Sequence, residues 1–324
     1  MATLIGIDEA GYGPLLGPLV VSAVSLEMPE KLFRSDHWNV LSKAVSQQKK
    51  GLCGRLLITD SKKAYSRKNG IDHLRRTVLS VIHAWKNGGI QTANIGDVLS
   101  LVCPDTLEHT DSYPWYKELN THTLGHDATD VTIAASVLEK SMVEHNIKIS
   151  AIQSKCLDVE QYNSRVRKVK NKSRVLFTEL CALILEAFGR NTGHTEPLQV
   201  IVDRQGGRVN YHQELLRMFP GFPLSVIRQE TNISSYELSR NGRSMRIHFC
   251  AKADTKYLVV SLASMVSKYL REIMMHSVNH YFCNLCPNLT PTAGYWEDGQ
   301  RFMKDLAAFL PLHSNHQEKL VRIL

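Results

Sequence analysis

The sequence predicts an α/β protein: a mixed β-sheet flanked by helices, with an inserted, mainly helical element. Two apolar runs, residues 3–8 and 198–203, each end at an aspartate, as a buried strand that stops at a loop does. Elsewhere, apolar residues recur at the three- and four-residue spacing of an amphipathic helix. Strands that alternate with helices in this way are typical of a sheet that carries helices on its faces.

The first strand ends at Asp8 and leads into a loop rich in glycine and proline, residues 11–18. Residues 19–26 then form a second apolar run. Because Gly and Pro separate two apolar runs that are close in sequence, we expect an antiparallel hairpin with a wide loop at its tip. Asp8 and Glu9 would lie at the mouth of that loop.

Helical spacing of apolar residues is present in four segments, which cover residues 71–85, 130–145, 161–188 and 251–275. Asp254 lies just before or inside the first turn of the last of these helices. We find neither internal repeats nor low-complexity linkers. We therefore expect one domain over residues 1–324, with an insertion at about 90–150 and a helical C-terminal part at about 276–324.

Composition excludes several classes of protein. Hydrophobic residues make up 43% and charged residues 22% of the chain, which is ordinary for a globular protein and unlike disordered or collagen-like chains. No run approaches the roughly 18 apolar residues of a membrane span, and the N-terminus lacks the pattern of a signal peptide. We expect a cytoplasmic protein without a membrane partner. The net charge of +8 permits a polyanionic partner but does not by itself indicate one.

Seven cysteines are scattered along the chain. The nearest approach to a zinc-binding pattern is Cys283-x-x-Cys286, which has no second cysteine or histidine pair at the spacing of a zinc finger. In a reducing compartment we expect free thiols and no disulfide framework.

Four acids stand where strands or helices begin or end, and they are Asp8, Glu9, Asp203 and Asp254. If they converge, their oxygens suit Mg²⁺ or Mn²⁺, and two such ions roughly 4 Å apart could support phosphodiester hydrolysis. The alternative is that each acid serves locally, as a loop entry, a turn former or a helix N-cap. Spacing alone leaves both interpretations open.

Residues 6–21 read GIDEAGYGPLLGPLVV and closely resemble the opening motif of the type 2 ribonucleases H, the ribonuclease HII family, usually GIDEAGRGPLxGPVV. Further segments resemble that family in the same order. They are DSKK at 60–63, LDVEQYN at 157–163, VIVD at 200–203, KADTKYLVVSLASMVSKYLRE at 252–272 and AGY at 293–295. The resemblance includes both ends of the chain and fails mainly over about 30–57 and 90–150.

The resemblance implies a ribonuclease H-like fold with a five-stranded mixed sheet. It also implies an endoribonuclease that uses Mg²⁺ or Mn²⁺ to cleave RNA in RNA–DNA hybrids or ribonucleotides embedded in DNA. The four acids named above would be its catalytic, metal-binding residues. Backbone groups of Gly11, Tyr12 and Gly13 would contact the scissile ribonucleotide, and Tyr295 would pack near the junction between ribonucleotide and deoxyribonucleotide.

One departure from the family motif concerns substrate. Tyr12 stands where the family usually has a basic residue, so a cationic phosphate contact is lost and an aromatic ring could stack there instead. Two other functions therefore remain open: a nucleic-acid-binding protein that keeps the fold without cleaving, and a nuclease for another structured substrate.

Other segments allow two interpretations each. Lys62 and Lys63 could meet substrate phosphates or be surface lysines at a helix start. The basic run 165–174 could grip a duplex or form a solvated helix face. The aromatic residues in 113–116 could stack on bases or pack as a loop. We assign Ser264 to packing, and residues 90–150 could recruit a protein partner.

Overall fold

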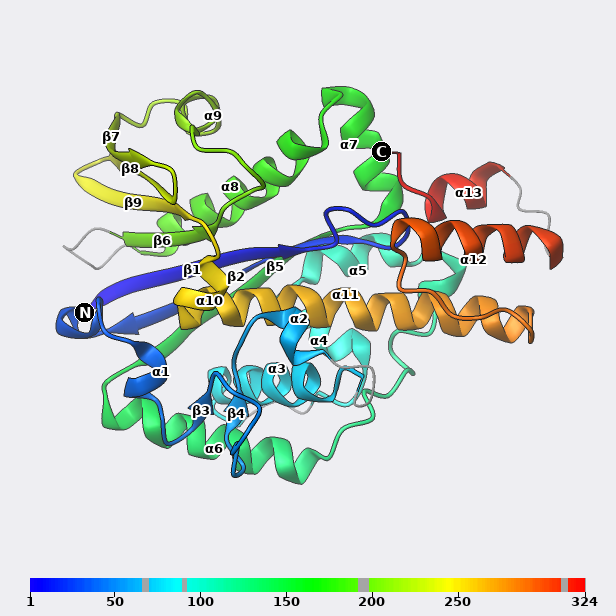
Figure 1. The fold of residues 1–324 in the computed structure, drawn as a ribbon, viewed down its shortest axis with the longest axis horizontal. Coiled ribbons are helices and arrows are strands. Elements are labelled where there is room, and N and C mark those ends of the chain that lie inside the picture. The colour runs from blue at the N-terminus through cyan, green and yellow to red at the C-terminus, as the bar shows by residue number, and fades with distance from the viewer. Residues whose placement is uncertain (66–69, 89–91, 192–197, 310–313, 324) are drawn as a thin grey trace.

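The computed structural model describes residues 1–65, 70–88, 92–191, 198–309 and 314–323. A seven-stranded sheet runs through it in the order β5-β2-β1-β6-β9-β8-β7 (Figure 1). The strands are β1 (Ala2–Ala10), β2 (Leu19–Met28), β5 (Lys148–Leu157), β6 (Leu198–Asp203), β7 (Leu224–Glu230), β8 (Ile233–Arg240) and β9 (Arg243–Cys250). The mixed α/β architecture expected from the sequence is confirmed.

The central strands carry the acids close to their ends: β1 runs two residues past the expected end at Asp8, to Ala10, and Asp203 is the last residue of β6. β1 pairs antiparallel with β2, which confirms the expected hairpin, and parallel with β6, where Ile7 lies opposite Val202. β6 pairs parallel with β9 in turn. Since parallel strands end at the same edge of a sheet, Asp8 and Asp203 emerge side by side.

Helices cover the two faces of the sheet (Figure 1). On one face, Ile7 and Val202 pack in a core with residues of α8 (Lys172–Arg190). On the other face, Leu4 and Ile201 pack in a core with residues of α11 (Leu258–Leu285). This alternation of residues along β1 and β6 is the two-residue period of a strand buried on both faces.

The remaining helices frame these layers. They are α1 (His37–Val40), α2 (Ser61–Ala64), α3 (Asp72–Trp85), α4 (Ile95–Val102), α5 (Pro104–Thr110), α6 (Ala128–Glu144), α7 (Val159–Val169), α9 (His212–Met218), α10 (Ala253–Lys256), α12 (Trp296–Phe309) and α13 (Ser314–Leu320). Two short strands, β3 (Val45–Ser46) and β4 (Leu56–Leu57), form a separate parallel pair, and η1 (Glu30–Leu32) and η2 (Pro114–Tyr116) are 3₁₀ turns. No helix in the described ranges is long and apolar enough to cross a membrane.

Residues 90–150 hold the helices α4, α5 and α6, in agreement with the expected helical character. The last residues of that range already belong to β5, which pairs with β2. The aromatic residues Tyr113, Trp115 and Tyr116 are buried and pack on one another. Their interpretation as a base-stacking platform is therefore wrong, and the packed loop is correct.

Two helices replace the single one expected over 161–188. α7 ends at Val169, and the next residue, Lys170, has a left-handed φ of 50°. α8 begins after Asn171, whose side chain accepts a hydrogen bond from the Arg174 backbone N. A left-handed residue followed by an Asn N-cap ends one helix and starts another. The apolar spacing continues across the break, so periodicity alone did not reveal it.

The sheet has two more strands than the resemblance implied. β8 and β9 form a hairpin whose turn is Asn241-Gly242, with φ values of 52° and 72°, and β7 pairs with the outer side of β8. Positive φ at both central residues is the signature of a type I′ hairpin turn, for which Asn-Gly is preferred. The Asn-Gly dipeptide in the sequence therefore indicates the hairpin that β8 and β9 form.

Candidate active site

The acids at the ends of β1 and β6 lie together. Asp8 and Asp203 each follow the paired residues Ile7 and Val202, and the Asp203 charge acts on both Asp8 and Glu9. The Glu9 backbone N donates to Asp8 Oδ1 at 2.8 Å, which fixes the orientation of the Asp8 carboxylate. Strand pairing thus collects three carboxylates at one edge of the sheet.

A turn after β9 brings in the fourth acid. Lys252 has a φ of 55°, and this left-handed residue starts α10, which carries Asp254 in its first turn. The Ala253 backbone N donates to Asp203 Oδ1 at 2.6 Å. Because Ala253 and Asp254 are adjacent, this bond holds the Asp254 backbone beside Asp203.

The pKa values of these acids are raised, so their ionisation is unfavourable in the folded protein. Burial raises the pKa of Asp8 well above its usual range, and the Glu9 and Asp203 charges raise it further. Burial, followed by the Asp203 charge, raises the pKa of Glu9 to about 7. Burial also raises the pKa of Asp203 to about 6, with a contribution from Asp254. Buried acids that repel one another cannot all ionise by themselves, but they can do so around a cation.

Two serines of α11 support Asp8. Ser264 lies close enough to the Asp8 carboxylate to lower its pKa, and Ser264 Oγ donates to Ser61 Oγ at 3.1 Å. Ser267 Oγ donates to the Asp8 carbonyl oxygen at 2.9 Å. Ser264, expected to serve packing alone, therefore also contacts an acid of the site.

The start of α11 lies directly against β1 at Gly6. A Cβ on Gly6 would lie 2.4 Å from the Val259 carbonyl carbon and 2.5 Å from the Val260 backbone N. Only glycine permits this backbone-to-backbone approach. Gly6 is two residues before Asp8. Its contact with α11 therefore sets how closely α11 packs against the part of β1 that carries the acids.

Two buried arginines hold the glycine-rich loop. Arg271 Nη1 donates to the Pro18 carbonyl oxygen at 2.9 Å, and Arg322 Nε donates to that of Gly17 at 2.7 Å. Arg322 also donates to the carbonyl oxygen of Gly11, whose φ is +87°. Five donors in a planar fork suit a loop that presents several carbonyl groups at once. The loop is thereby fixed next to Glu9.

Tyr12 lies on the side of this loop that is near the start of α8. Its ring centroid is 5.4 Å from Lys172 Nζ, and the nearby Ser173 side chain lowers the Tyr12 pKa. Burial raises the pKa of Tyr12, and the Glu9 charge adds to the shift. A Cβ added to Gly13, by contrast, would meet no atom within 4 Å, so the surface at Gly13 is open.

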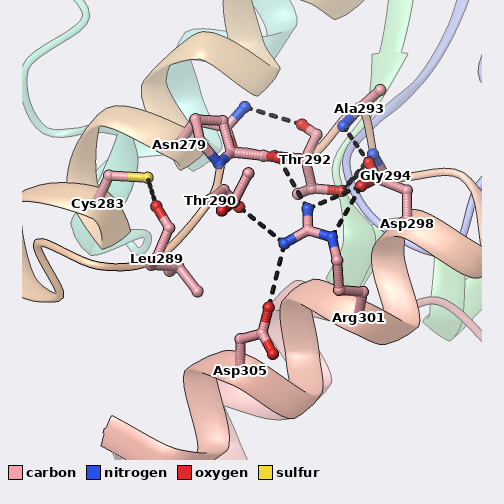
Figure 2. Close-up of polar contacts among 11 residues, drawn as sticks. Asn279, Cys283, Leu289, Thr290, Thr292, Ala293, Gly294, Asp298, Arg301 and Asp305 are labelled. Carbon is pink, nitrogen blue, oxygen red and sulfur yellow. Dashed lines mark hydrogen bonds and ion pairs between the residues drawn. The ribbon is translucent and has the colours of Figure 1, made fainter.

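A polar network orders the segment that precedes Tyr295 (Figure 2). The Asp298 carboxylate accepts from Thr292 Oγ1 at 2.6 Å and from the Ala293 backbone N at 2.7 Å. Arg301 donates to Asp298 at 2.8 Å and to backbone carbonyls of the same segment. The first turn of α12 therefore fixes the approach to Tyr295.

That segment also joins the glycine-rich loop. The Gly294 carbonyl oxygen accepts from the Leu15 backbone N at 2.8 Å and from that of Leu16 at 3.1 Å. Tyr295 itself is 48% exposed, and Lys268 Nζ lies 5.8 Å from its ring centroid. Because Lys268 is one helical turn after Ser264, Tyr295 borders the face of α11 that meets the acids.

No family model matches this sequence, and neither does any curated protein. The chain is similar to RNase HII in its complex with PCNA from Archaeoglobus fulgidus, at 16% identity over 99% of this chain and 94% of that one, with a TM-score of 0.44. It is also similar to Bst-RNase HIII in complex with Mn²⁺, at 12% identity over 99% of this chain and 66% of that one, with a TM-score of 0.45. A third is ribonuclease H2 from Pyrococcus horikoshii OT3, at 14% identity over 95% and 86% of the two chains, with a TM-score of 0.39. Since identities are this low and TM-scores lie below 0.5, these similarities by themselves assign no function to this chain.

Basic side chains border the acids. Lys62 lowers the pKa of both Glu9 and Asp254, and Lys63 lowers that of Asp254. A hollow of about 430 Å³ adjoins Asp203. Its basic lining residues are Arg204, Lys252 and Lys256. The site thus has carboxylates at its centre and basic side chains around them. This arrangement suits a ligand whose phosphate groups contact the basic side chains on both sides of the acids.

Sequence patterns missed one further acid. Asp60 caps α2 by accepting from the Lys62 backbone N at 2.9 Å, and its charge raises the pKa of Asp254. Asp60 belongs to the DSKK segment, so the motif was visible but its place in the site was not. Of the predicted residues, the four acids and Lys62 converge, while Gly11, Tyr12, Gly13 and Tyr295 lie on segments bonded or adjacent to them.

Proposed function

We propose that this chain is a divalent-metal-dependent endoribonuclease that cleaves the RNA strand of RNA–DNA hybrids. The observation that carries the proposal is the convergence of Asp8, Glu9, Asp203 and Asp254 at the shared edge of β1 and β6. Each of these acids stands in a segment that resembles a ribonuclease HII motif. Geometry and resemblance point to the same four residues.

The donor set fits a hard divalent cation. All four side chains are carboxylates, burial raises the pKa of each, and mutual repulsion adds to this for at least three of them. Oxygen donors of this kind favour Mg²⁺ or Mn²⁺ over zinc. When bound, the cation would neutralise the carboxylates, make water more acidic and stabilise negative charge on the leaving oxygen. Asp8, Glu9, Asp203 and Asp254 would hold it.

The chain's own residues would position the substrate. Lys62, Lys63 and the lysines beside Asp203 supply positive charge on the rim, which neutralises phosphates and favours a nucleic acid over an uncharged ligand. Water would add across the P–O3′ bond and leave a 3′-hydroxyl and a 5′-phosphate. Ser264 and Ser267 would keep Asp8 in place during this step.

Selection for RNA would come from the glycine-rich loop and Tyr295. The loop is held rigid by Arg271 and Arg322, and its open position at Gly13 lets a backbone group approach a 2′-hydroxyl. Tyr295 offers an exposed ring beside the same loop. Tyr12 lacks the positive charge usual at its position, so uniform hybrids are the primary proposed substrate.

The test uses three end-labelled duplexes with the full chain: a uniform RNA–DNA hybrid, DNA with one ribonucleotide, and all-DNA. Each is incubated with Mg²⁺, with Mn²⁺ and with EDTA. Asp203→Asn tests the site, and Asp72→Asn is the matched control, since Asp72 is an exposed residue of α3. We expect cation-dependent cleavage of the hybrid by the wild type and by Asp72→Asn, and none by Asp203→Asn.

Each other result has a defined meaning. Hybrid binding without cleavage in either metal would favour a non-cleaving binding protein. Cleavage of all-DNA, or of none of these duplexes but of a branched substrate, would favour a nuclease with another specificity. Cleavage that persists in Asp203→Asn would refute the proposed site.

A further inference from the structure

A second cluster of ligand-type side chains lies outside the carboxylate site. Glu118, His122 and His280 each offer one ligand atom, and these atoms all lie within 4.8 Å of one another. His122 Nε2 is 3.2 Å from Glu118 Oε2, and His280 Nε2 is 3.8 Å from the same oxygen. One carboxylate oxygen and two imidazole nitrogens therefore lie close enough together to bind one ion.

The cluster is remote from the four acids. His280 follows Leu258, the first residue of α11, by 22 residues (280 minus 258) within that single helix. At about 1.5 Å per residue this separation is roughly 33 Å. Asp254 stands before the opposite end of α11, so the two clusters share no ligand.

His122 is already arranged as a ligand. Its Nδ1 lies 3.3 Å from Ser277 Oγ, and its side chain is only 12% exposed. Its Nε2 is buried and has no hydrogen-bond partner, although Glu118 is near. A metal-bound histidine typically engages a second group through its other nitrogen, as His122 engages Ser277. An unpartnered buried nitrogen is costly unless something binds it.

His280 Nε2 is likewise an acceptor. The Asn284 side-chain amide nitrogen lies 3.0 Å from it and can only donate, so this contact uses the tautomer in which His280 Nε2 accepts. A metal would replace that amide. His276, one turn earlier, lies farther away, with its ring centroid 5.9 Å from that of His122 and 6.2 Å from that of His280.

We propose that Glu118, His122 and His280 form a zinc-binding site. Two imidazoles and one carboxylate are a donor set that suits Zn²⁺, and a water would complete a tetrahedral arrangement. The mixed nitrogen and oxygen set separates this site from the all-carboxylate site, which suits Mg²⁺ or Mn²⁺. The proposal is independent of the nuclease activity.

A zinc ion at this site would link two segments that are far apart in sequence. Glu118 and His122 belong to the loop before α6, and His280 belongs to the C-terminal half of α11. The same loop receives backbone hydrogen bonds at the start of α4, from Ile95 N to His122 O at 3.1 Å and from Gly96 N to Leu119 O at 3.0 Å. The ion would thus tie residues 95–122 to α11 and stabilise the folded state.

The experiment measures zinc on the tag-free full chain by competitive titration against a zinc-binding dye in excess Mg²⁺. The variants are His122→Ala, His280→Ala and Ser277→Ala. His109→Ala, an exposed histidine of α5, is the matched control. Asp203→Asn tests whether the carboxylate site contributes, and Cys283→Ser tests a nearby thiol.

We expect one zinc equivalent in the wild type and in the His109, Asp203 and Cys283 variants. Loss of a group that supports a ligand costs about 10- to 100-fold in affinity, so Ser277→Ala should bind about tenfold more weakly. The two ligand variants should lose more than Ser277→Ala. Zinc should raise the melting temperature of the wild type and leave that of His280→Ala unchanged. The Co²⁺ form should lack a thiolate charge-transfer band.

Two results would overturn the proposal. One is zinc affinity and thermal shift in His122→Ala and His280→Ala equal to the wild type. The other is a thiolate band that disappears in Cys283→Ser, which would assign the ion to cysteine. Circular dichroism of each variant separates loss of a ligand from loss of the fold.

Discussion

Asp203 Oδ1 accepts a hydrogen bond from the Ala253 backbone N at 2.6 Å, so one acid of the site holds the segment that carries the next acid. The bond links the end of β6 to the turn after β9, although the two residues are 50 positions apart. It requires an acceptor oxygen but no negative charge. A mutation of Asp203 to Asn can therefore remove the negative charge and still keep an acceptor oxygen for this hydrogen bond.

Asp203→Asn should stabilise the cation-free protein while it abolishes cleavage. The pKa of Asp203 is raised from 3.8 to about 6, so its stabilising contribution is complete below 3.8 and is lost as pH rises through 6. Above that pH the ionised, buried side chain destabilises the fold. The amide keeps the bond to Ala253, so we expect a gain of about 1 to 3 kcal/mol.

Urea denaturation in EDTA, at a pH above 7 and again near pH 4, checks this prediction. The gain should be present at the higher pH and absent at the lower one. Mg²⁺ or Mn²⁺ should stabilise the wild type more than Asp203→Asn. An equal or lower stability of the variant at the higher pH would contradict the electrostatic account.

Lys62→Ala should weaken substrate binding more than Lys63→Ala. Lys62 acts on both Glu9 and Asp254, whereas Lys63 acts on Asp254 alone, so Lys62 lies nearer the centre of the site. Loss of one phosphate contact should reduce the salt dependence of binding by about one counterion. A KM increase of about tenfold is expected for Lys62→Ala, equivalent to about 1.4 kcal/mol.

Hybrid binding at several salt concentrations measures the slope for each variant. Lys86→Ala, at the end of α3, is a control that should keep the wild-type slope. If Lys62→Ala also keeps that slope, Lys62 is a surface lysine and does not meet phosphate.

Gly11→Ala should destabilise the protein, and Gly13→Ala should not. Gly11 has a φ of +87°, and a Cβ there would lie 2.6 Å from the Pro18 carbonyl oxygen. Strain and close contact together should cost about 2 to 4 kcal/mol. Gly13 has open space around its Cα, so Gly13→Ala should keep wild-type stability. Thermal denaturation compares them, and equal melting temperatures would contradict this prediction.

Arg271→Met should destabilise the glycine-rich loop. Arg271 is buried and donates to three backbone carbonyl groups, those of Pro18, Leu16 and Ala293, at 2.9, 3.0 and 3.1 Å. Methionine fills similar volume but leaves the carbonyls without donors, at a cost of about 3 to 5 kcal/mol. Urea denaturation measures the loss. Arg217→Met, on the exposed face of α9, should change stability by less than about 0.5 kcal/mol.

His248 should make the stability of the protein depend on pH in the acidic range. Its ring lies 2.8 Å from Ser235 Oγ and 2.7 Å from Gln199 Oε1. Burial, with help from Arg246, lowers the pKa of His248 from 6.5 to about 4. Its contribution is therefore complete above 6.5 and falls by at most about 1.4 kcal/mol per pH unit down to 4.

Urea denaturation of the wild type and of His248→Gln, from about pH 4 to 7, isolates this effect because other groups titrate in both proteins. The wild type should lose stability faster than His248→Gln as the pH falls. Parallel curves would show that His248 has the same pKa in the folded and the unfolded protein, and would contradict the lowered pKa.

The sequence alone determined the central strands, most helices and the identity of the candidate acids. Local patterns suffice for these features. Buried strands read as apolar runs, helices read as periodic stripes, and Asp8, Glu9, Asp203 and Asp254 each stand in a motif with a recognisable spacing. The Asn241-Gly242 turn was equally local, and it would have predicted the β8–β9 hairpin.

Only the tertiary structure decided which side chains meet. The pairing of β1 with β6 sets Asp8 beside Asp203, and the packing of α11 sets Ser264 against Asp8. The same is true of His122 and His280, which are far apart in sequence and have no common motif. Such contacts depend on how buried surfaces of separate segments fit together, and that fit is a property of the whole fold that no local pattern encodes.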